Sequence, residues 1–193
     1  MEEFFDVCDE NGIPTGEIIS RKKAHETGVC HRTAHVWVIR NVSDGDAEIL
    51  LQKRSDEKDS FPGCYDTSAA GHVMAGDTPE KSAERELYEE LGIKTNPGEL
   101  KYIGFFRNKY EMTFRDRLFR DNEISNVYIY DGKVDAENLR LQTEEVSAVK
   151  WFGLKYVCGQ KQIHNRQFCV PMTGLKVLMN YLGIEYNNDG GCG

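Results

Sequence analysis

Three glutamates near the middle of the chain have the spacing to bind a metal ion together. Glu86, Glu89 and Glu90 lie in a stretch with helical periodicity, and at about 100° per residue they fall within an arc of roughly 100°. Like charges three and four residues apart each destabilise a helix by roughly 0.2–0.5 kcal/mol. A divalent cation such as Mg²⁺ or Mn²⁺, which prefers oxygen ligands, would remove that penalty. Arg85 precedes the three glutamates and is expected to hold one carboxylate through a bidentate contact.

The same stretch carries signals for both ends of a helix. Asp77 or Thr78 can cap the N-terminus, Pro79 suits the first turn, and Gly92 is a typical C-terminal stop. Apolar residues at every fourth position form the side that is expected to pack on the core: Ala83, Leu87 and Leu91. The acidic residues therefore border the buried side of the predicted helix.

The stretch from Gly71 to Ile93 resembles the Nudix box, whose pattern is G-x5-E-x7-R-E-U-x-E-E-x-G-U with U an aliphatic residue. Eight of the nine specified positions are met, and the exception is Asp77, where the family has glutamate. The resemblance implies an α/β fold, the Nudix-type α/β/α sandwich with a mixed central sheet. It also implies a hydrolase that uses Mg²⁺, or alternatively Mn²⁺, to cleave a diphosphate linkage.

The resemblance assigns roles within the box. Glu86, Glu89 and Glu90 are the implied metal ligands, and Glu86 or Glu90 is expected to accept the proton of the attacking water. Arg85 is expected to be structural, and Gly71 to let the backbone approach the metal. The alternative interpretation is an ordinary solvated acidic face of a helix.

A second resemblance, over about residues 5–155, is to isopentenyl-diphosphate isomerase and its hydrolase relatives. The shared segments are Asp9-Glu-Asn-Gly12, Ala24-His25, His31-Arg32, Gln52-Lys53-Arg54, Phe61-Pro62-Gly63, Asp66 to His72, Asp121-Asn-Glu123 and Glu144-Glu145-Val146. The isomerase has a catalytic cysteine at the position of Ala70 and a degraded acidic helix, whereas this chain has a methyl group and the complete acidic set. The resemblance therefore favours a hydrolase. The alternatives are an isopentenyl-diphosphate Δ-isomerase and a non-catalytic, nucleotide-binding Nudix domain.

Isomerase-like positions also suggest a second site. His31 and His72 match two metal-ligating histidines of the isomerase, His25 lies near a third, and Asp121 and Glu123 match its acidic pair. A second metal or acid/base site built on His31, His72 and Glu123 would favour Mn²⁺ or Zn²⁺ over Mg²⁺. The alternatives are that His31 hydrogen-bonds a loop, that His72 caps the box and that Glu123 faces solvent.

Two basic residues are candidates for binding the phosphates of the substrate. Lys53 and Arg54 end a predicted strand before a loop, and the alternative is that both are solvated cations. Glu144 and Glu145 lie in a loop that approaches the metals in many Nudix relatives. The substrate is left open among nucleoside di- and triphosphates, nucleotide sugars, dinucleotides of the ADP-ribose type and prenyl diphosphates.

Composition narrows the kind of partner. The net charge of −8 over 193 residues argues against a nucleic-acid-binding surface, and no apolar run approaches the roughly 20 residues of a membrane span. The acidic N-terminus lacks the order of a signal peptide, and the six cysteines, without a CxxC pair, are expected to be reduced. We expect a cytoplasmic enzyme with a small-molecule diphosphate substrate and no nucleic-acid or membrane partner. A homodimer is left open.

Local patterns predict a single Nudix domain over residues 1–185 and a mobile tail at 186–193. A small N-terminal hairpin is expected to begin with residues 4–8, and a loop is expected at 25–31. Strands are predicted at 34–39, 49–52, 65–70, 102–106, 124–130 and 146–152. A C-terminal helix is predicted at 175–182.

Overall fold

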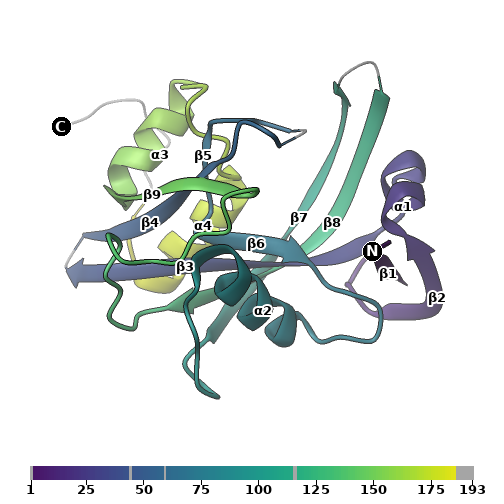
Figure 1. Cartoon of the computed structure of the whole chain (residues 1–193), viewed down its shortest axis with the longest axis horizontal. Helices are drawn as coiled ribbons and strands as arrows, with labels where there is room; N and C mark the ends of the chain where they lie inside the picture. The colour runs from purple at the N-terminus through teal and green to yellow at the C-terminus, as the bar shows by residue number, and fades with distance from the viewer. Residues whose placement is uncertain (1, 44, 59, 115–116, 186–193) are drawn as a thin grey trace.

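A mixed sheet lies at the centre of the molecule (Figure 1). The computed structural model describes residues 2–43, 45–58, 60–114 and 117–185, so the predicted tail at 186–193 lies outside the described residues. Within these ranges seven strands form the sheet, with β6 beside β3 and β9 beside β4 in addition to the order β5-β4-β3-β8-β7. The strands are β3 (His31–Ser43), β4 (Asp46–Arg54), β5 (Tyr65–Asp66), β6 (Ala69–His72), β7 (Lys101–Phe114), β8 (Arg117–Tyr130) and β9 (Val146–Gly153). Strands β3 and β8 run parallel, and the other pairs are antiparallel.

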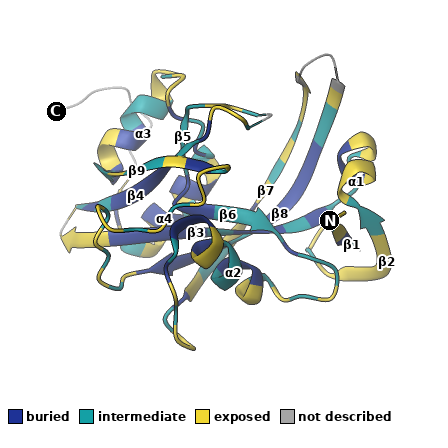
Figure 2. Cartoon of the chain, in the orientation of Figure 1, coloured by how far each residue is buried: buried dark blue, intermediate teal, exposed yellow. Residues whose placement is uncertain are grey.

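Helices cover both faces of this sheet. Helix α2 (Pro79–Leu91) packs on one face, where its apolar side meets β3 and β4. Helices α3 (Leu154–Gln162) and α4 (Met172–Leu182) pack on the other face. Figure 2 shows the buried residues following the middle of β3, β4 and β8 between these helices. The predicted α/β/α sandwich with a mixed central sheet is confirmed, whereas α3 is an element that the sequence patterns did not predict.

Helix α2 begins and ends close to where the sequence predicts. The side chain of Thr78, rather than that of Asp77, caps the N-terminus by accepting a hydrogen bond from the Lys81 amide at 3.3 Å. Gly92 ends the helix with φ at 72°, a left-handed conformation in which glycine is not strained. The predicted apolar stripe is fully buried. Packing of this stripe fixes the rotation of the helix and hence the direction of its acidic side.

Strands β3 and β4 separate partway along their length and form a fork. The second half of β3 pairs with β4, but its residues 33–36 pair with β6, while Gln52 and Lys53 of β4 pair with β5. Ser68, between β5 and β6, joins the two branches because its hydroxyl accepts a hydrogen bond from the Val38 amide at 2.8 Å and donates one to the Leu50 carbonyl. The single strand predicted at 65–70 is therefore wrong, since the chain crosses the fork as two short strands.

An N-terminal layer covers one end of the sheet. The predicted hairpin is confirmed as β1 (Phe4–Cys8) and β2 (Pro14–Ser20), and it leads into α1 (Arg21–Thr27). The loop predicted at 25–31 is wrong in its first part, because α1 continues to Thr27 and ends at Gly28. Helix α1 lies against β8 and buries Ala24 and His25, which supplies the packing that stabilises so short a helix.

The hairpin of β7 and β8 extends well beyond the two strands predicted at 102–106 and 124–130. Its paired residues continue outward from Arg107 and Ile124 to Phe114 and Arg117 and project as an arm (Figure 1). The outer half of the arm is rich in charged and amide side chains, and the strand predictions did not include its alternation of Tyr110, Met112 and Phe114 with polar residues. None of the helices in the described residues is long and apolar enough to cross a membrane.

The apolar side of α2 can be tested by truncating Leu87, which is completely buried. Leu87→Ala should lower the free energy of unfolding by about 2–5 kcal/mol, because the lost transfer energy adds to that of the cavity. Urea unfolding of the variant measures the change. Lys81→Ala on the exposed side of the same helix is the matched control and should stay within about 0.5 kcal/mol of wild type. Equal losses in both variants would contradict this packing.

Candidate active site

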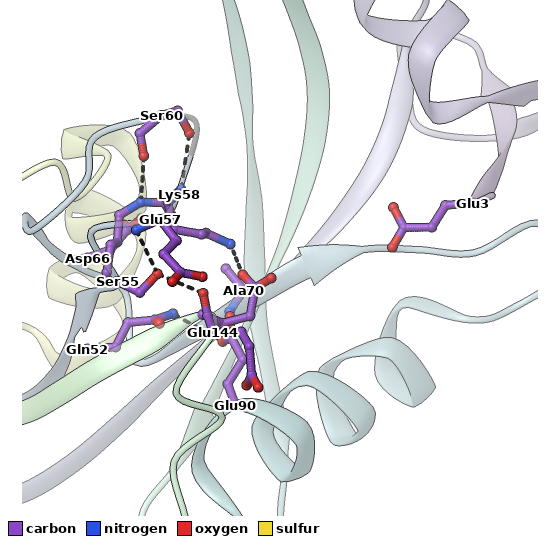
Figure 3. A network of polar contacts seen from close by, with 12 residues as sticks. Glu3, Gln52, Ser55, Glu57, Lys58, Ser60, Asp66, Ala70, Glu90 and Glu144 are labelled. Carbon is purple, nitrogen blue, oxygen red and sulfur yellow. Dashed lines mark hydrogen bonds and ion pairs between the residues drawn. The ribbon is translucent and has the colours of Figure 1, made fainter. Parts of the chain in front are cut away.

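The carboxylate of Glu90 lies inside the fork and bonds to both of its branches. It accepts a hydrogen bond from the Gln52 side chain of β4 at 3.0 Å and another from the Ala70 amide of β6 at 3.1 Å (Figure 3). The residue is 5% exposed. Burial, with the nearby charge of Glu86, raises the pKa of Glu90 from 4.5 to about 8. The group is therefore close to its titration point at neutral pH.

Glu86 lies against the backbone of β6 at Gly71. A Cβ atom at Gly71 would come within 2.1 Å of the Glu86 carboxyl carbon, so the carboxylate occupies the space that glycine leaves free. Glycine is thus required here for the approach of Glu86, which is a different reason from the expected approach of the backbone to a metal. Burial raises the pKa of Glu86, and the charge of Arg85 partly opposes that effect.

Arg85 connects two glutamates to β6. Its Nη1 lies 2.8 Å from a carboxylate oxygen of Glu86 and 3.2 Å from one of Glu89, while Nη2 donates to the His72 carbonyl at 3.1 Å. The expected bidentate contact with one carboxylate is therefore wrong, because the guanidinium spans two. Glu89 is half-exposed on the Arg85 side, so in the described structure the three box glutamates do not form one compact set of ligands.

A second group of ligand-type side chains lies at the end of the sheet beneath the N-terminal layer. We call it the histidine cluster, and its members are His25 of α1, His31 of β3, His72 of β6, and Asp121 and Glu123 of β8. The Glu123 carboxylate lies 3.4 Å from His72 Nε2 and 3.6 Å from His31 Nε2, and Asp121 lies 3.9 Å from His25 Nδ1. The structure thus brings together all five residues that the isomerase resemblance singled out.

The histidine cluster is buried and short of hydrogen-bond partners. The Phe5 ring stacks on His31 and His72, at centroid distances of 5.1 and 4.4 Å. His31 Nδ1 faces the Val29 carbonyl at 2.9 Å, as the loop alternative expected, yet its Nε2 points into the cluster without a partner. The other unpartnered buried atoms are both ring nitrogens of His25, Nε2 of His72 and Oδ1 of Asp121. Three imidazoles and two carboxylates with free lone pairs suit a divalent transition metal.

The pKa values of the two carboxyl groups in the histidine cluster are shifted in opposite directions. Burial, with the charge of Glu123, raises the pKa of Asp121 to about 9. Burial alone would also raise the pKa of Glu123, but the imidazoles of His31 and His72, whose Nε2 atoms lie 3.6 and 3.4 Å from its carboxylate, outweigh it and hold that pKa well below its usual value. Burial lowers the pKa of His25 to about 3, which keeps this imidazole neutral and able to act as a ligand.

Basic side chains surround the fork. Arg54 pairs with Asp66 at 3.0 Å and donates to the Ser60 carbonyl at 2.9 Å, so it shapes the loop after β4. Lys53 precedes Arg54 on β4 and pairs with Tyr65 of β5. Both basic residues are partly buried, so neither is a fully solvated cation at the end of a strand.

Lys58 extends from that loop toward the strand that carries Ala70 and pairs with Glu145 (Figure 3). Burial lowers the pKa of Lys58, and the charges of Arg54 and Arg21 add to this effect while that of Glu90 opposes it. The Ser55 hydroxyl donates to the Glu144 carbonyl at 2.7 Å, which brings the loop with the two predicted acids to the same place.

Sequence reasoning missed Arg21 and the role of Gln52. Arg21 begins α1, pairs with Glu3 at 2.8 Å, and its charge adds to the burial that lowers the pKa of His72. The charge of Arg21 also acts on Lys58, so Arg21 lies within electrostatic range of both the fork and the histidine cluster. No periodicity or motif marks this residue, since its position depends on how the N-terminal layer folds over the sheet.

Comparison with known proteins gives a consistent picture. A model of the NUDIX domain matches residues 31–169. Nudix hydrolase 3 of Arabidopsis thaliana is 43% identical over 152 residues, which are 78% of this chain but 19% of that protein, so the chain spans about a fifth of that relative. An uncharacterized Nudix hydrolase of Clostridium acetobutylicum is 39% identical over 75% of this chain and 67% of its own length.

Isomerases and a solved structure are also similar. An isopentenyl-diphosphate Delta-isomerase of Photorhabdus laumondii is 30% identical over 80% of this chain and 79% of its own length. The crystal structure of a Deinococcus radiodurans protein superposes with a TM-score of 0.67 at 18% identity, and the match covers 91% of this chain and 98% of the other. At that identity the structural match bears on the fold alone.

The raised pKa of Glu90 predicts how stability varies with pH. A carboxyl group whose pKa is 4.5 when unperturbed and about 8 in the fold favours the fold fully below pH 4.5, and this contribution is lost as the pH rises through 8. At about 1.4 kcal/mol per pKa unit, the loss is on the order of a few kcal/mol. Urea unfolding in EDTA at several pH values should therefore show a decline between about pH 5 and pH 8. Glu90→Gln should remove most of it, and an unchanged decline in that variant would contradict the assignment.

Proposed function

The chain belongs to the NUDIX family, and we propose that it is a hydrolase of the branch that resembles isopentenyl-diphosphate isomerase. It would cleave the diphosphate linkage of a small organic diphosphate with the aid of divalent metal ions. The observation that carries this proposal is the carboxylate pair of Glu86 and Glu90 at the edge of β6, in which Glu90 is buried and Glu86 is partly buried. Two carboxylates held close together in a buried position favour a bound cation, which removes both their repulsion and their desolvation penalty.

The residues at the fork fit distinct tasks in such a reaction. Mg²⁺, or alternatively Mn²⁺, held by the box glutamates would neutralise diphosphate oxygens and lower the pKa of a bound water. Glu86 or Glu90 would accept the proton of that water, and the raised pKa of each carboxyl makes it a more effective base at neutral pH. Arg85 would position Glu86 and Glu89 rather than touch the substrate.

Cations on the opposite side of the fork would bind the charge of the substrate. We assign this task to Lys58 and Arg21, because Lys58 lies near Glu90 and the charge of Arg21 reaches Lys58. Arg54 would act mainly by holding the loop that presents Lys58, since three of its guanidinium nitrogens are engaged, one by Asp66 and two by the carbonyl and hydroxyl oxygens of Ser60. Lys53 stays a substrate-binding candidate on the strength of its place beside this loop.

The histidine cluster is proposed as a separate site for a transition metal such as Mn²⁺ or Zn²⁺. Its unpartnered imidazole nitrogens and the free oxygen of Asp121 support this assignment, because buried polar atoms in native proteins ordinarily have partners. His31, His72 and Glu123 would be ligands on the sheet, with His25 contributed by α1.

The same cluster is the observation that favours a second function, isopentenyl-diphosphate Δ-isomerase, since named isomerases are among the relatives. Ala70 opposes it, because a methyl group cannot exchange a proton with the substrate. A non-catalytic nucleotide-binding domain is the third function, and the complete set of box glutamates argues against it.

A substrate panel tests the hydrolase. Nucleoside di- and triphosphates, nucleotide sugars, ADP-ribose and prenyl diphosphates, including isopentenyl diphosphate, would be incubated with Mg²⁺ or Mn²⁺ and assayed for release of phosphate or pyrophosphate. We expect turnover of at least one compound, its loss in EDTA, and a fall in kcat of about 100-fold or more in Glu90→Gln. Glu84→Gln, on the same helix outside the pair, is the matched control and should retain activity.

Two results would go against this proposal. Absence of hydrolysis across the panel would remove the hydrolase, and proton exchange into isopentenyl diphosphate without phosphate release would favour the isomerase. Unchanged turnover in Glu90→Gln would instead remove the assignment of the fork as the metal site.

Metal analysis tests the histidine cluster. We expect the purified protein to take up Mn²⁺ or Zn²⁺ at a stoichiometry that His72→Ala abolishes, with affinity falling by more than the roughly 10–100-fold seen when a hydrogen-bond partner of a ligand is lost. Calorimetric titration and elemental analysis measure this. His164→Ala changes an exposed histidine and should bind metal like wild type. Failure of the wild-type protein to bind any transition metal would rule out this site.

A further inference from the structure

His35 is a polar residue beside the apolar core, and packing in that core does not require its imidazole nitrogens. Strand β3 alternates, so His31, Thr33, His35 and Trp37 share one face of the sheet, the face opposite to α2. The first two residues of this row belong to or contact the histidine cluster, while Trp37 is fully buried in the apolar core. His35 is thus the last polar residue before that core.

The hydrogen bonding of the ring is incomplete. Nδ1 of His35 is buried without a partner, whereas the residue as a whole is partly exposed, so Nε2 is the nitrogen left to reach solvent. The ring packs edge-on against Phe106, at a centroid distance of 5.3 Å. An unpaired buried lone pair is less unfavourable than an unpaired buried N–H, so we place the hydrogen on Nε2. Burial lowers the pKa of His35, which keeps the imidazole neutral.

His35 is the neighbour on β3 of the β6 residue whose amide bonds to Glu90. Its register partner on β6 is Ala70, whose amide donates to Glu90, and side chains directly opposite on antiparallel strands have Cβ atoms about 5 Å apart. Charges from both sides reach the ring, since Glu123 of the histidine cluster and Asp66 beside Arg54 both act on it. The Ala70 side chain lies on the same face as His35, so a diphosphate bound at the free edge of β6 that extends past Ala70 would reach the imidazole.

We infer that His35 is a substrate-binding residue whose Nε2–H donates a hydrogen bond to a phosphoryl oxygen of the diphosphate held at the fork. The inference rests on the proposed function for the presence of a diphosphate, but it assigns a residue that neither motif includes. A neutral donor here adds affinity for the diphosphate oxygens without adding a charge beside the metal-binding carboxylates. The unpartnered Nδ1 is the energetic penalty that the fold accepts for keeping this donor in place.

Direct binding of methylenediphosphonate in the presence of Mg²⁺ tests the inference, because this probe carries the diphosphate oxygens without an organic group and cannot be hydrolysed. His35→Phe keeps the ring shape but removes the donor, and calorimetry should show a Kd about tenfold or more above that of wild type. His35→Gln places an amide N–H near the position of Nε2 and should restore binding to within about threefold. His164→Phe is the matched control at an exposed histidine and should bind like wild type.

Thermal unfolding separates binding from a structural role. His35→Phe should be at least as stable as wild type, because an apolar ring replaces a buried nitrogen without a partner. Unchanged probe affinity in His35→Phe, a loss in His35→Gln as large as in His35→Phe, or no binding to wild type would each overturn the inference. Affinity that depends on His35 in a protein that hydrolyses no diphosphate would support the inference and remove the hydrolase. Hydrolysis of a diphosphate by the wild-type protein, together with unaltered probe affinity in His35→Phe, would overturn the inference and leave the hydrolase in place.

Discussion

A carboxylate buried between two diverging strands sets the geometry on which the rest of the site depends. Glu90 accepts one hydrogen bond from β4 and one from β6, and its backbone carbonyl accepts a third from Gln142 in the loop before β9. Burial next to Glu86 disfavours the ionised form, so the position is stable only because the apolar stripe of α2 packs firmly on the sheet. The helix cannot rotate to release its acids into solvent without exposing Leu87 and Leu91. Packing energy thus holds two acidic groups where electrostatics alone would not keep them.

Strand β6 separates two kinds of chemistry by a single residue. Because side chains alternate along a strand, Gly71 faces α2 and leaves room for Glu86, while Ala70 and His72 face the other side. The carboxylates of the box therefore gather on one side, and the imidazoles gather with Asp121 and Glu123 on the other. Arg85 spans the two, since the guanidinium that contacts Glu86 also bonds to the His72 carbonyl. A shift of β6 along its register would disturb both groups of ligands together.

The sequence predicted the parts of the molecule whose signals are local. The ends and the apolar stripe of α2, the N-terminal hairpin and the sandwich of helices around a sheet all follow from capping residues, turn residues and periodicity. The features that could not be predicted from the sequence depend on contacts between distant segments. The rotation of Glu89 toward Arg85, the bridge made by Ser68 and the place of Arg21 are set by packing that no spacing encodes. Helix α1 was missed because seven residues carry little periodicity, and its stability comes from burial against β8.

The N-terminal layer has a consequence for where this domain can be cut. The segment that matches the NUDIX model begins at residue 31, yet β1 supplies the Phe5 ring that covers two imidazoles, and α1 supplies His25. Asp6 also pairs with Arg32 and bonds to the Gly76 amide in the loop before α2. A fragment trimmed to residues 31–169 would keep the whole acidic helix but lose the covering ring, one imidazole of the histidine cluster and the anchor of that loop. The segment that the family model matches is therefore shorter than the segment that builds the histidine cluster and its cover.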